Sequence, residues 1–214
     1  MTLVQKMQVV DQIAYALRHM HSNGYVHRDI KMDNICVRSA VSLSAAPTTT
    51  DTTRSDYGSQ SNKGAVVATL IDLETCMKVD DINPSNLVGT PLYFHPLVVT
   101  NLEQSKNPYD GEVNAYDVDV WAFAVLVLAI FSHGYAWESA SLTDSGYRKF
   151  KSYTPNTPDT WVEDYRIIHM ANLNHNVVAE NMVYTALRIL RTCESRCPLE
   201  NRGTADLEAF SWRP

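Results

Sequence analysis

Apolar residues recur every three to four positions along residues 4–20, and this spacing predicts the first helix of the chain. Gly24 follows after a short polar run, at a place where a left-handed residue commonly ends a helix. Short strands are expected at residues 25–27 and 35–37. A run of β-branched residues over 65–72 predicts a third strand, which we expect to be buried.

Helical patterns dominate the second half of the chain. Residues 116–132 are almost entirely apolar and predict a buried core helix. The uninterrupted apolar run, residues 118–131, is shorter than the ~20 residues that span a membrane, so no membrane span is expected. Residues 159–170 and 179–191 show amphipathic helical spacing, and residues 205–210 show a weaker helical pattern.

The segment between residues 39 and 64 differs in kind from its surroundings. It is rich in Ser and Thr and poor in large apolar residues, so it cannot offset the entropy lost on ordering. We expect a disordered surface insertion within a single domain that covers residues 1–214. A phosphorylated regulatory loop is the alternative interpretation of this segment.

Composition narrows the class of protein. With 214 residues, 45% of them hydrophobic, the chain is long enough for one domain with its own core. A net charge of -6 argues against a nucleic-acid-binding protein, which usually has a basic face. The four cysteines form no CxxC pair and no secretory leader is visible, so we expect an intracellular, cytoplasmic protein with reduced thiols.

The strongest chemical pattern is His27-Arg28-Asp29, followed by Lys31 and Asn34. Phosphoryl transfer needs a carboxylate that orients the substrate hydroxyl, a cation near the phosphate, and carboxylate or amide ligands for Mg²⁺. Asp29 is the candidate base, Lys31 the candidate cation and Asn34 the candidate metal ligand. This spacing resembles the catalytic loop of protein kinases.

Four further blocks, in the order of the family, extend the resemblance to the C-terminal lobe of eukaryotic protein kinases. Residues 70–74 stand where the family has its Asp-Phe-Gly metal motif, and residues 89–96 resemble the end of its activation segment. Residues 119–124 resemble the start of the central helix, and residues 201–207 the closing Arg-Pro-Thr segment. The implied fold is mainly α, a kinase-like C-terminal lobe with small β-hairpins at the catalytic loop and no N-terminal β lobe.

The resemblance implies a nucleotide site that uses ATP and Mg²⁺. Asp72 would be the principal Mg²⁺ ligand, with Asn34 as the second. Lys31 would lie at the γ-phosphate, and Cys36 would lie beneath the adenine ring. Leu73 would replace the usual Phe as a hydrophobic plug.

The same resemblance implies supporting roles for other residues. Lys31 and Gly89-Thr90 favour the Ser/Thr type of kinase over the Tyr type. Thr90 would hydrogen-bond near Asp29 and Lys31 and help to position them. Asp119 would accept hydrogen bonds from the backbone of the catalytic loop. We interpret His27 as a packed structural histidine. His21, at the end of the first helix, is expected to be solvated.

Two departures from the family pattern affect the expected chemistry. Glu74 replaces a glycine whose backbone is free to take positive φ, and it adds negative charge beside Asp72. We expect Glu74 to weaken the binding of nucleotide and metal. The alternative is that Glu74 serves as an extra metal ligand. Leu97 replaces the Glu that pairs with a late Arg, here Arg202, so we expect Arg202 to be more exposed or to pair with Glu200.

Arg28 would normally pair with a phosphate on the activation segment, but the corresponding residue here is Asn86, which cannot be phosphorylated. Asp80 or Asp81 could take the place of the phosphate, or Ser85 could be a shifted phosphorylation site. We predict that function does not depend on phosphorylation at residue 86.

No Gly-rich loop and no Lys-bearing strand precede the first helix. We therefore expect the C-lobe of a Ser/Thr kinase that phosphorylates protein substrates with ATP and is inactive, or nearly so, by itself. The alternative is a pseudokinase-like binding or regulatory module. In either case the uncovered apolar face predicts poor solubility or a bound partner protein.

Overall fold

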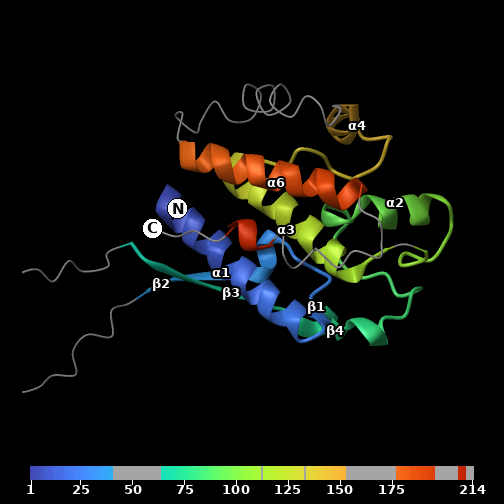
Figure 1. Ribbon diagram of the computed structural model, residues 1–214, viewed down its shortest axis with the longest axis horizontal. Helices are drawn as coiled ribbons and strands as arrows, with labels where there is room; N and C mark the ends of the chain where they lie inside the picture. The colour runs from blue at the N-terminus through green and yellow to red at the C-terminus, as the bar shows by residue number, and fades with distance from the viewer. Residues whose placement is uncertain (41–63, 112, 133, 153–176, 196–206, 211–214) are drawn as a thin grey trace, which may run out of the picture.

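Three long helices form the body of the fold: α1 (Leu3–Ser22), α3 (Ala115–Ser132) and α6 (Val177–Ser195). Figure 1 shows α3 in the middle, with α6 on one side and α1 on the other. The fold is mainly α, as the sequence predicts. The computed structural model describes residues 1–40, 64–111, 113–132, 134–152, 177–195 and 207–210.

Helix α3 is the core of the described fold. All of its residues except Tyr116 are buried, because neighbouring elements cover it on every side. Its length and composition would allow a membrane span, yet 94% of the helix is buried inside the protein. The prediction of a buried core helix is therefore confirmed.

Helix α1 has clear signals at both ends. The Thr2 hydroxyl accepts a hydrogen bond from the Gln5 backbone N–H, and the Gln5 side chain accepts one from the Thr2 N–H, which forms a capping box. After the helix, Gly24 has φ +77° and donates its N–H to the His21 carbonyl. Gly24 thus provides the left-handed stop that the sequence predicts.

Two small antiparallel sheets lie on either side, in sequence, of residues 27–34, the segment that resembles a kinase catalytic loop and is called the catalytic loop below. β1 (Tyr25–Val26) pairs with β4 (Met77–Lys78), and β2 (Ile35–Ser39) pairs with β3 (Val66–Leu70). The loop between β1 and β2 is therefore held at each end by a strand from later in the chain. β4 pairs with the strand before the loop, and β3 pairs with the strand after it.

Strand β3 differs from the prediction. It covers Val66–Leu70 rather than residues 65–72, and only Val66 is buried. The strand lies in a two-stranded sheet, and α1 contacts it through Gln8 and Gln12, whose side-chain oxygens accept hydrogen bonds from β3 backbone N–H groups. β-branched residues indicate a strand, but a strand is buried only where other elements cover both faces of its sheet.

The predicted insertion of residues 39–64 begins too early. Ser39 is a strand residue opposite Val66, and the Ala40 N–H donates to the Ala65 carbonyl at 2.9 Å. The remainder of the segment, residues 41–63, lies outside the described residues.

The other elements agree with the sequence to different degrees. The helix predicted at 179–191 is present as α6, while the one at 159–170 lies outside the described residues. The weak pattern at 205–210 corresponds to a 3-10 turn at Leu207–Phe210. Two short helices were not predicted: α2 (Pro96–Glu103) and α4 (Ser145–Ser152).

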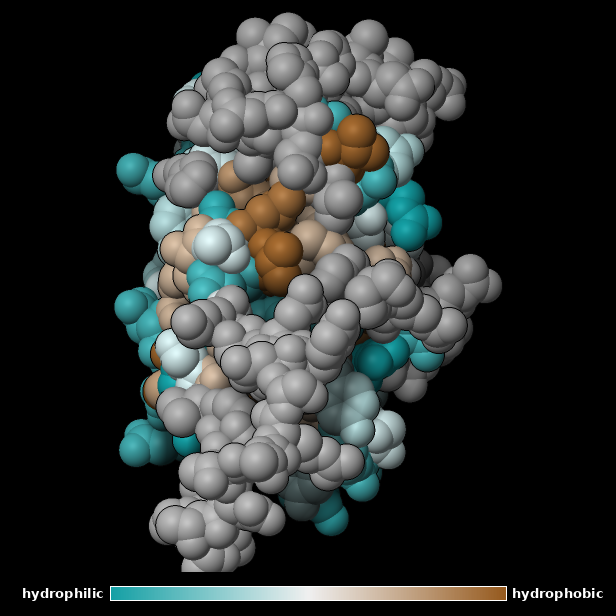
Figure 2. All heavy atoms as spheres, turned by 90° about the vertical axis from the view of Figure 1, so that its left-hand side faces the viewer, coloured by the Kyte–Doolittle hydropathy of each residue, from teal (hydrophilic) through white to brown (hydrophobic). Residues whose placement is uncertain are grey.

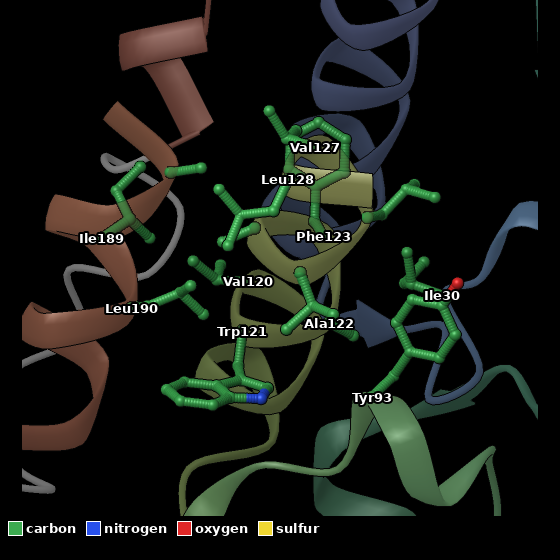
Figure 3. Packing of buried hydrophobic residues seen from close by; sticks show 14 of the residues in the cluster. Ile30, Tyr93, Val120, Trp121, Ala122, Phe123, Val127, Leu128, Ile189 and Leu190 are labelled. Atoms are coloured by element: carbon green, nitrogen blue, oxygen red, sulfur yellow. The ribbon is translucent and has the colours of Figure 1, made fainter. Parts of the chain in front are cut away.

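Side chains of α3 connect the core to the catalytic loop. Figure 3 shows Val120 on the side of α3 that faces Ile189 of α6, whereas Ala122 faces Ile30 and Tyr93 on the opposite side. Ile30 is part of the catalytic loop and is 1% exposed. Packing against α3 therefore holds both the catalytic loop and the segment around Tyr93.

Part of the surface is apolar. Figure 2 shows apolar residues gathered on the face at which α1 and α6 begin. Val4, near the start of α1, is 50% exposed, and Val177, the first residue of α6, is 66% exposed.

We predict that Trp121→Ala lowers the free energy of unfolding by about 3–5 kcal/mol, because it empties a fully buried site. The indole of Trp121 packs against the rings of His95, Trp137 and Phe150. Urea unfolding measures the change. Leu142→Ala, at an exposed position, is the control and should change stability by less than about 0.5 kcal/mol. Equal effects of the two variants would contradict the central position of Trp121.

Candidate active site

Asp119 of α3 fixes the backbone at the start of the catalytic loop. Its carboxylate accepts the His27 N–H at 2.7 Å and the Arg28 N–H at 2.8 Å, and it contacts His21 Nε2 at 3.0 Å. Asp119 is completely buried. Arg28 has φ +72°, a strained conformation for a residue other than glycine. The hydrogen bonds to Asp119 hold the loop in this conformation.

His21 was expected to be solvated, and that expectation is wrong. Its side chain is buried and pairs with Asp119. The sequence does contain a signal for this position, because His21 follows the buried Leu17 by four residues and therefore lies on the same face of α1.

His27 is a packed residue whose two ring nitrogens are both engaged. Nδ1 faces the Asp29 N–H at 3.4 Å, and Nε2 lies 3.1 Å from the Ile71 carbonyl. A nitrogen that faces an N–H must accept, so the ring proton is on Nε2 and is donated to Ile71. His27 thereby links the catalytic loop to the segment that carries Asp72.

Three side chains meet at the carboxylate of Asp29. Lys31 Nζ lies 2.6 Å from Oδ2, and Asn34 Nδ2 donates to the same oxygen at 3.1 Å. The Thr90 hydroxyl donates to Oδ1 at 2.9 Å and accepts from Lys31 Nζ at 3.3 Å. Thr90 stands 61 residues after Asp29, so the fold assembles this cluster from two distant segments.

The charge of Lys31 is stabilised by its surroundings. The hydrogen bond to Asp29 raises the pKa of Lys31 above its ordinary value of 10.5. Partial burial lowers the pKa, but the negative charges of Asp29, Asp33 and Asp72 raise it further. A raised pKa keeps the ammonium protonated at every pH below that value. Lys31 is therefore a cation throughout the physiological range.

Asn34 and Asp72 are brought side by side by the β2–β3 pairing. The Ile71 N–H donates to the Asn34 carbonyl at 2.9 Å, which places Asp72 next to the catalytic loop. Because Asn34 donates its amide NH₂ to Asp29, its side-chain oxygen is oriented as an acceptor, and it has no protein donor among the described residues. Asp72 is exposed.

These two oxygen donors fit Mg²⁺. Magnesium is usually held by one or two protein ligands together with waters and substrate phosphates. In the described part of the chain no cluster of three or more His, Cys, Asp or Glu residues could bind a metal without such help. The donor set therefore suits a metal that arrives with a nucleotide.

The residues after Asp72 do not behave as expected. Leu73 is 57% exposed, so it is not a hydrophobic plug within the described fold. Glu74 lies in a 3-10 turn, Leu73–Thr75, and does not have positive φ; that conformation is found at Asp72 instead, with φ +62°. The backbone cost expected at Glu74 is thus absent, because Glu74 itself does not take positive φ.

Cys36 and Leu97 lie on a strand and a helix at the edge of the site. Cys36 is exposed on β2, opposite Thr69 of β3. Leu97 lies in the first turn of α2, and its N–H donates to His95 Nδ1 at 3.2 Å. Arg202 and Glu200, the predicted pair, lie outside the described residues.

Arg28 is buried without a carboxylate partner among the described residues. Its guanidinium donates to the Asn86 carbonyl at 3.2 Å, contacts Met77 Sδ at 3.4 Å and lies over the Tyr109 ring at 5.7 Å. Neither Asp80 nor Asp81 forms an ion pair with it in this part of the chain, so the expectation that one of them replaces the phosphate is wrong. A backbone carbonyl takes that place, and it needs no modification.

A pair of tyrosines was not identified from the sequence as part of the site. The hydroxyl groups of Tyr93 and Tyr135 lie 2.9 Å apart, and the Met32 N–H contacts the Tyr93 hydroxyl at 3.4 Å. Burial is the main cause that raises the pKa of Tyr93, so this hydroxyl stays protonated. No local pattern marks Tyr135, because its contact depends on the path of the chain after α3.

Residues 2–193 match the protein kinase domain family. The chain belongs to this family. It is 30% identical to the serine/threonine-protein kinase SBK1 of Danio rerio over 156 residues, which is 71% of this chain and 33% of that protein. It is 28% identical to SBK1 of Mus musculus, over 71% of this chain and 30% of that protein. With the human serine/threonine-protein kinase ULK1 it shares 26% identity, over 78% of this chain and 14% of that protein.

The chain spans about a third, or less, of the length of these relatives. The match shows membership of the protein kinase family, and the relatives named here are serine/threonine-protein kinases. It does not confirm the expectation that the N-terminal β lobe is absent, because the matched region begins at residue 2.

We predict that Asp119→Asn lowers the free energy of unfolding by about 1–3 kcal/mol. An amide keeps one acceptor oxygen but presents NH₂ to a backbone N–H, which leaves a buried donor unpaired. Hydrogen exchange at the His27 and Arg28 amides should accelerate together. Asp80→Asn, at an exposed position, is the control. Unchanged exchange at the two amides would show that Asp119 does not hold the loop.

We also predict that the segment around Asn86 keeps its order without phosphate. Phosphatase treatment or Ser85→Ala should leave amide exchange at residues 86–90 unchanged, because the Ser85 hydroxyl is bonded to Asn83 and not to Arg28. Arg28→Ala should accelerate exchange there, since it removes the contact with the Asn86 carbonyl. A segment that becomes protected only after phosphorylation of Ser85 would contradict this prediction.

Proposed function

We propose that the chain is the catalytic C-terminal lobe of a Ser/Thr protein kinase, which transfers the γ-phosphoryl group of ATP to hydroxyl groups of protein substrates. The observation that carries this proposal is the cluster around Asp29, in which Lys31, Asn34 and Thr90 all contact one carboxylate. Membership of the protein kinase family supports it.

In this mechanism Asp29 orients the substrate hydroxyl and accepts its proton. Thr90 holds one carboxylate oxygen, while Lys31 and Asn34 hold the other, so the carboxylate is fixed before the substrate arrives. Fixed groups of this kind lower the barrier because little reorganisation is needed during the reaction. Lys31 adds a permanent positive charge beside the place where the phosphoryl group passes.

Asp72 and Asn34 would hold Mg²⁺ with ATP. When bound, the metal would neutralise negative charge on the phosphates. The protein contributes one carboxylate and one amide oxygen on adjacent ends of β2 and β3, and the exposed Cys36 would lie beneath the adenine ring. We place the protein inside the cell, where thiols such as Cys36 remain reduced.

A second lobe or a partner protein would complete the nucleotide site. A groove of about 730 Å³ runs between α1 and β3, with Tyr15, Leu70 and Leu73 among its lining residues. Tyr15 is 65% exposed and Leu73 57% exposed. Since Leu73 directly follows Asp72, a protein that covers this groove also adjoins the metal ligands. We propose that the chain by itself has little or no turnover.

A pseudokinase-like binding module is the second candidate. The exposed position of Leu73 and the replacement of glycine by Glu74 favour it, because both alter the metal loop. The intact cluster around Asp29 favours the kinase instead. The two candidates differ in whether the chain binds nucleotide in a metal-dependent way.

We predict that Mg²⁺ and ATP together raise the melting temperature of the chain, whereas ATP without metal does so much less. Ligand at a hundredfold excess over its dissociation constant stabilises by about 2.7 kcal/mol. Asp72→Asn should abolish the metal-dependent part, because it removes the carboxylate ligand. Asp29→Asn should retain it, because Asp29 is assigned to the substrate hydroxyl, and is therefore the matched control.

A parallel phosphotransfer assay separates the candidates further. We expect the chain alone to show no turnover above that of Asp29→Asn. Turnover that depends on Mg²⁺ and Asp29 would contradict the need for a second lobe but not the kinase assignment. The absence of any metal-dependent thermal shift would favour the binding module.

A further inference from the structure

Arg28 carries a buried positive charge that hydrogen bonds satisfy only in part. It is 4% exposed, and within the described part of the chain no carboxylate forms an ion pair with its side chain. One guanidinium nitrogen donates to the Asn86 carbonyl at 3.2 Å, and another contacts Met77 Sδ at 3.4 Å. The third, Nε, has no hydrogen-bond partner there. Because burying a cation is costly, another group is needed to stabilise this one.

The aromatic ring of Tyr109 supplies that contact. The central carbon of the Arg28 guanidinium lies 5.7 Å from the centroid of the ring. An aromatic face attracts a cation, and the attraction is stronger where water is excluded. Burial is the main cause that raises the pKa of Tyr109, and the charge of Arg28 opposes this shift, so the phenol is neutral at physiological pH. Tyr109 therefore stabilises Arg28 without carrying a charge of its own.

Helix α2 and the loop after it set the position of Tyr109. The Asn101 side chain donates to the carbonyls of Pro108 at 3.2 Å and Asp110 at 3.0 Å, which flank Tyr109 in sequence. The Asp110 carboxylate in turn accepts hydrogen bonds from the backbone and the side chain of Asn107. The loop that carries Tyr109 is thus held by contacts that do not involve the catalytic loop.

The backbone of Tyr109 contacts the segment that leads to Thr90. Its N–H donates to the Pro84 carbonyl at 3.2 Å, in the same turn as the Asn86 carbonyl that Arg28 holds. With its ring on Arg28 and its N–H on Pro84, Tyr109 joins the catalytic loop to this segment.

We infer that Tyr109 is a positioning residue for the catalytic cluster, which keeps Arg28 in contact with the Asn86 carbonyl when no phosphate is present. Since Thr90 donates to Asp29 at the end of the same segment, movement of the segment would loosen one of the contacts that fix the carboxylate. The consequence for phosphoryl transfer rests on the proposed function, whereas the positioning itself does not.

The test compares two substitutions in the full chain. Tyr109→Ala removes the ring, whereas Tyr109→Phe keeps it. Hydrogen exchange at the Asn86 amide, which donates to the Asn83 carbonyl at 2.9 Å, reports on the turn, and the NMR signal of the Thr90 methyl group reports on the contact with Asp29. We expect Tyr109→Ala to accelerate the exchange about tenfold and to shift the methyl signal. Tyr109→Phe should leave both close to those of the unaltered chain.

An exposed tyrosine provides the matched control. The ring of Tyr15 lies 5.8 Å from the guanidinium of Arg18 and is 65% exposed. Tyr15→Ala removes the same kind of contact at the surface, away from the segment that leads to Thr90, and should change neither measurement.

Inorganic phosphate separates positioning from a loss of packing. In Tyr109→Ala the guanidinium of Arg28 loses its aromatic partner and gains space beside it, so phosphate should bind there and restore slow exchange at Asn86. Chloride at the same ionic strength should not. In the unaltered chain phosphate should have no effect, because the ring occupies this place.

Every outcome decides the inference. Unchanged exchange in Tyr109→Ala, equal acceleration in Tyr109→Phe, or an acceleration that phosphate does not reverse would overturn it, the last by assigning Tyr109 a packing role only. Should Tyr109→Ala fail to fold, Asn101→Ala keeps the ring but removes the hydrogen bonds that hold its loop, and unchanged exchange at Asn86 in that variant would overturn the inference as well.

These measurements use no nucleotide, so the inference and the proposed function fail separately. The absence of a metal-dependent thermal shift would reject the kinase function and leave the positioning by Tyr109 intact. A normal thermal shift together with unchanged exchange in Tyr109→Ala would reject the positioning alone.

Discussion

The active-site geometry depends on one buried carboxylate. Asp119 belongs to the helix with the most complete burial in the described fold, and it holds the two backbone amides at which the catalytic loop begins. Burying a charge is costly unless donors surround it, and three donors do so here. These hydrogen bonds hold the catalytic loop in place against α3, so Asp29 and Lys31 are fixed relative to the core.

A second set of contacts joins the catalytic loop to the segment that ends in Thr90. Arg28 holds the Asn86 carbonyl, and Thr90 bonds Asp29. Between them, Gly89 has φ +105°, and a Cβ there would lie 2.6 Å from the Arg28 carbonyl. Only glycine allows the two backbones to approach so closely. A kinase-type cluster can therefore form without a phosphate, because neutral backbone contacts hold the segment in place.

The altered metal loop is compatible with this arrangement. Its left-handed residue is Asp72, Glu74 has no positive φ, and Leu73 is exposed. The groove between α1 and β3 adjoins this exposed leucine. The cluster around Asp29 is thus built within the described chain, whereas Leu73 leaves an apolar surface exposed beside it.

The sequence alone determined the long helices, the helix stop at Gly24 and the chemistry of the catalytic loop, because periodicity and motif spacing act over a few residues. Only the tertiary structure decided the pairing of His21 with Asp119, the partner of Arg28 and the hydroxyl pair of Tyr135. These contacts join residues that are 98, 58 and 42 positions apart. No local pattern encodes them, since they arise when the packing of α3 brings distant segments together.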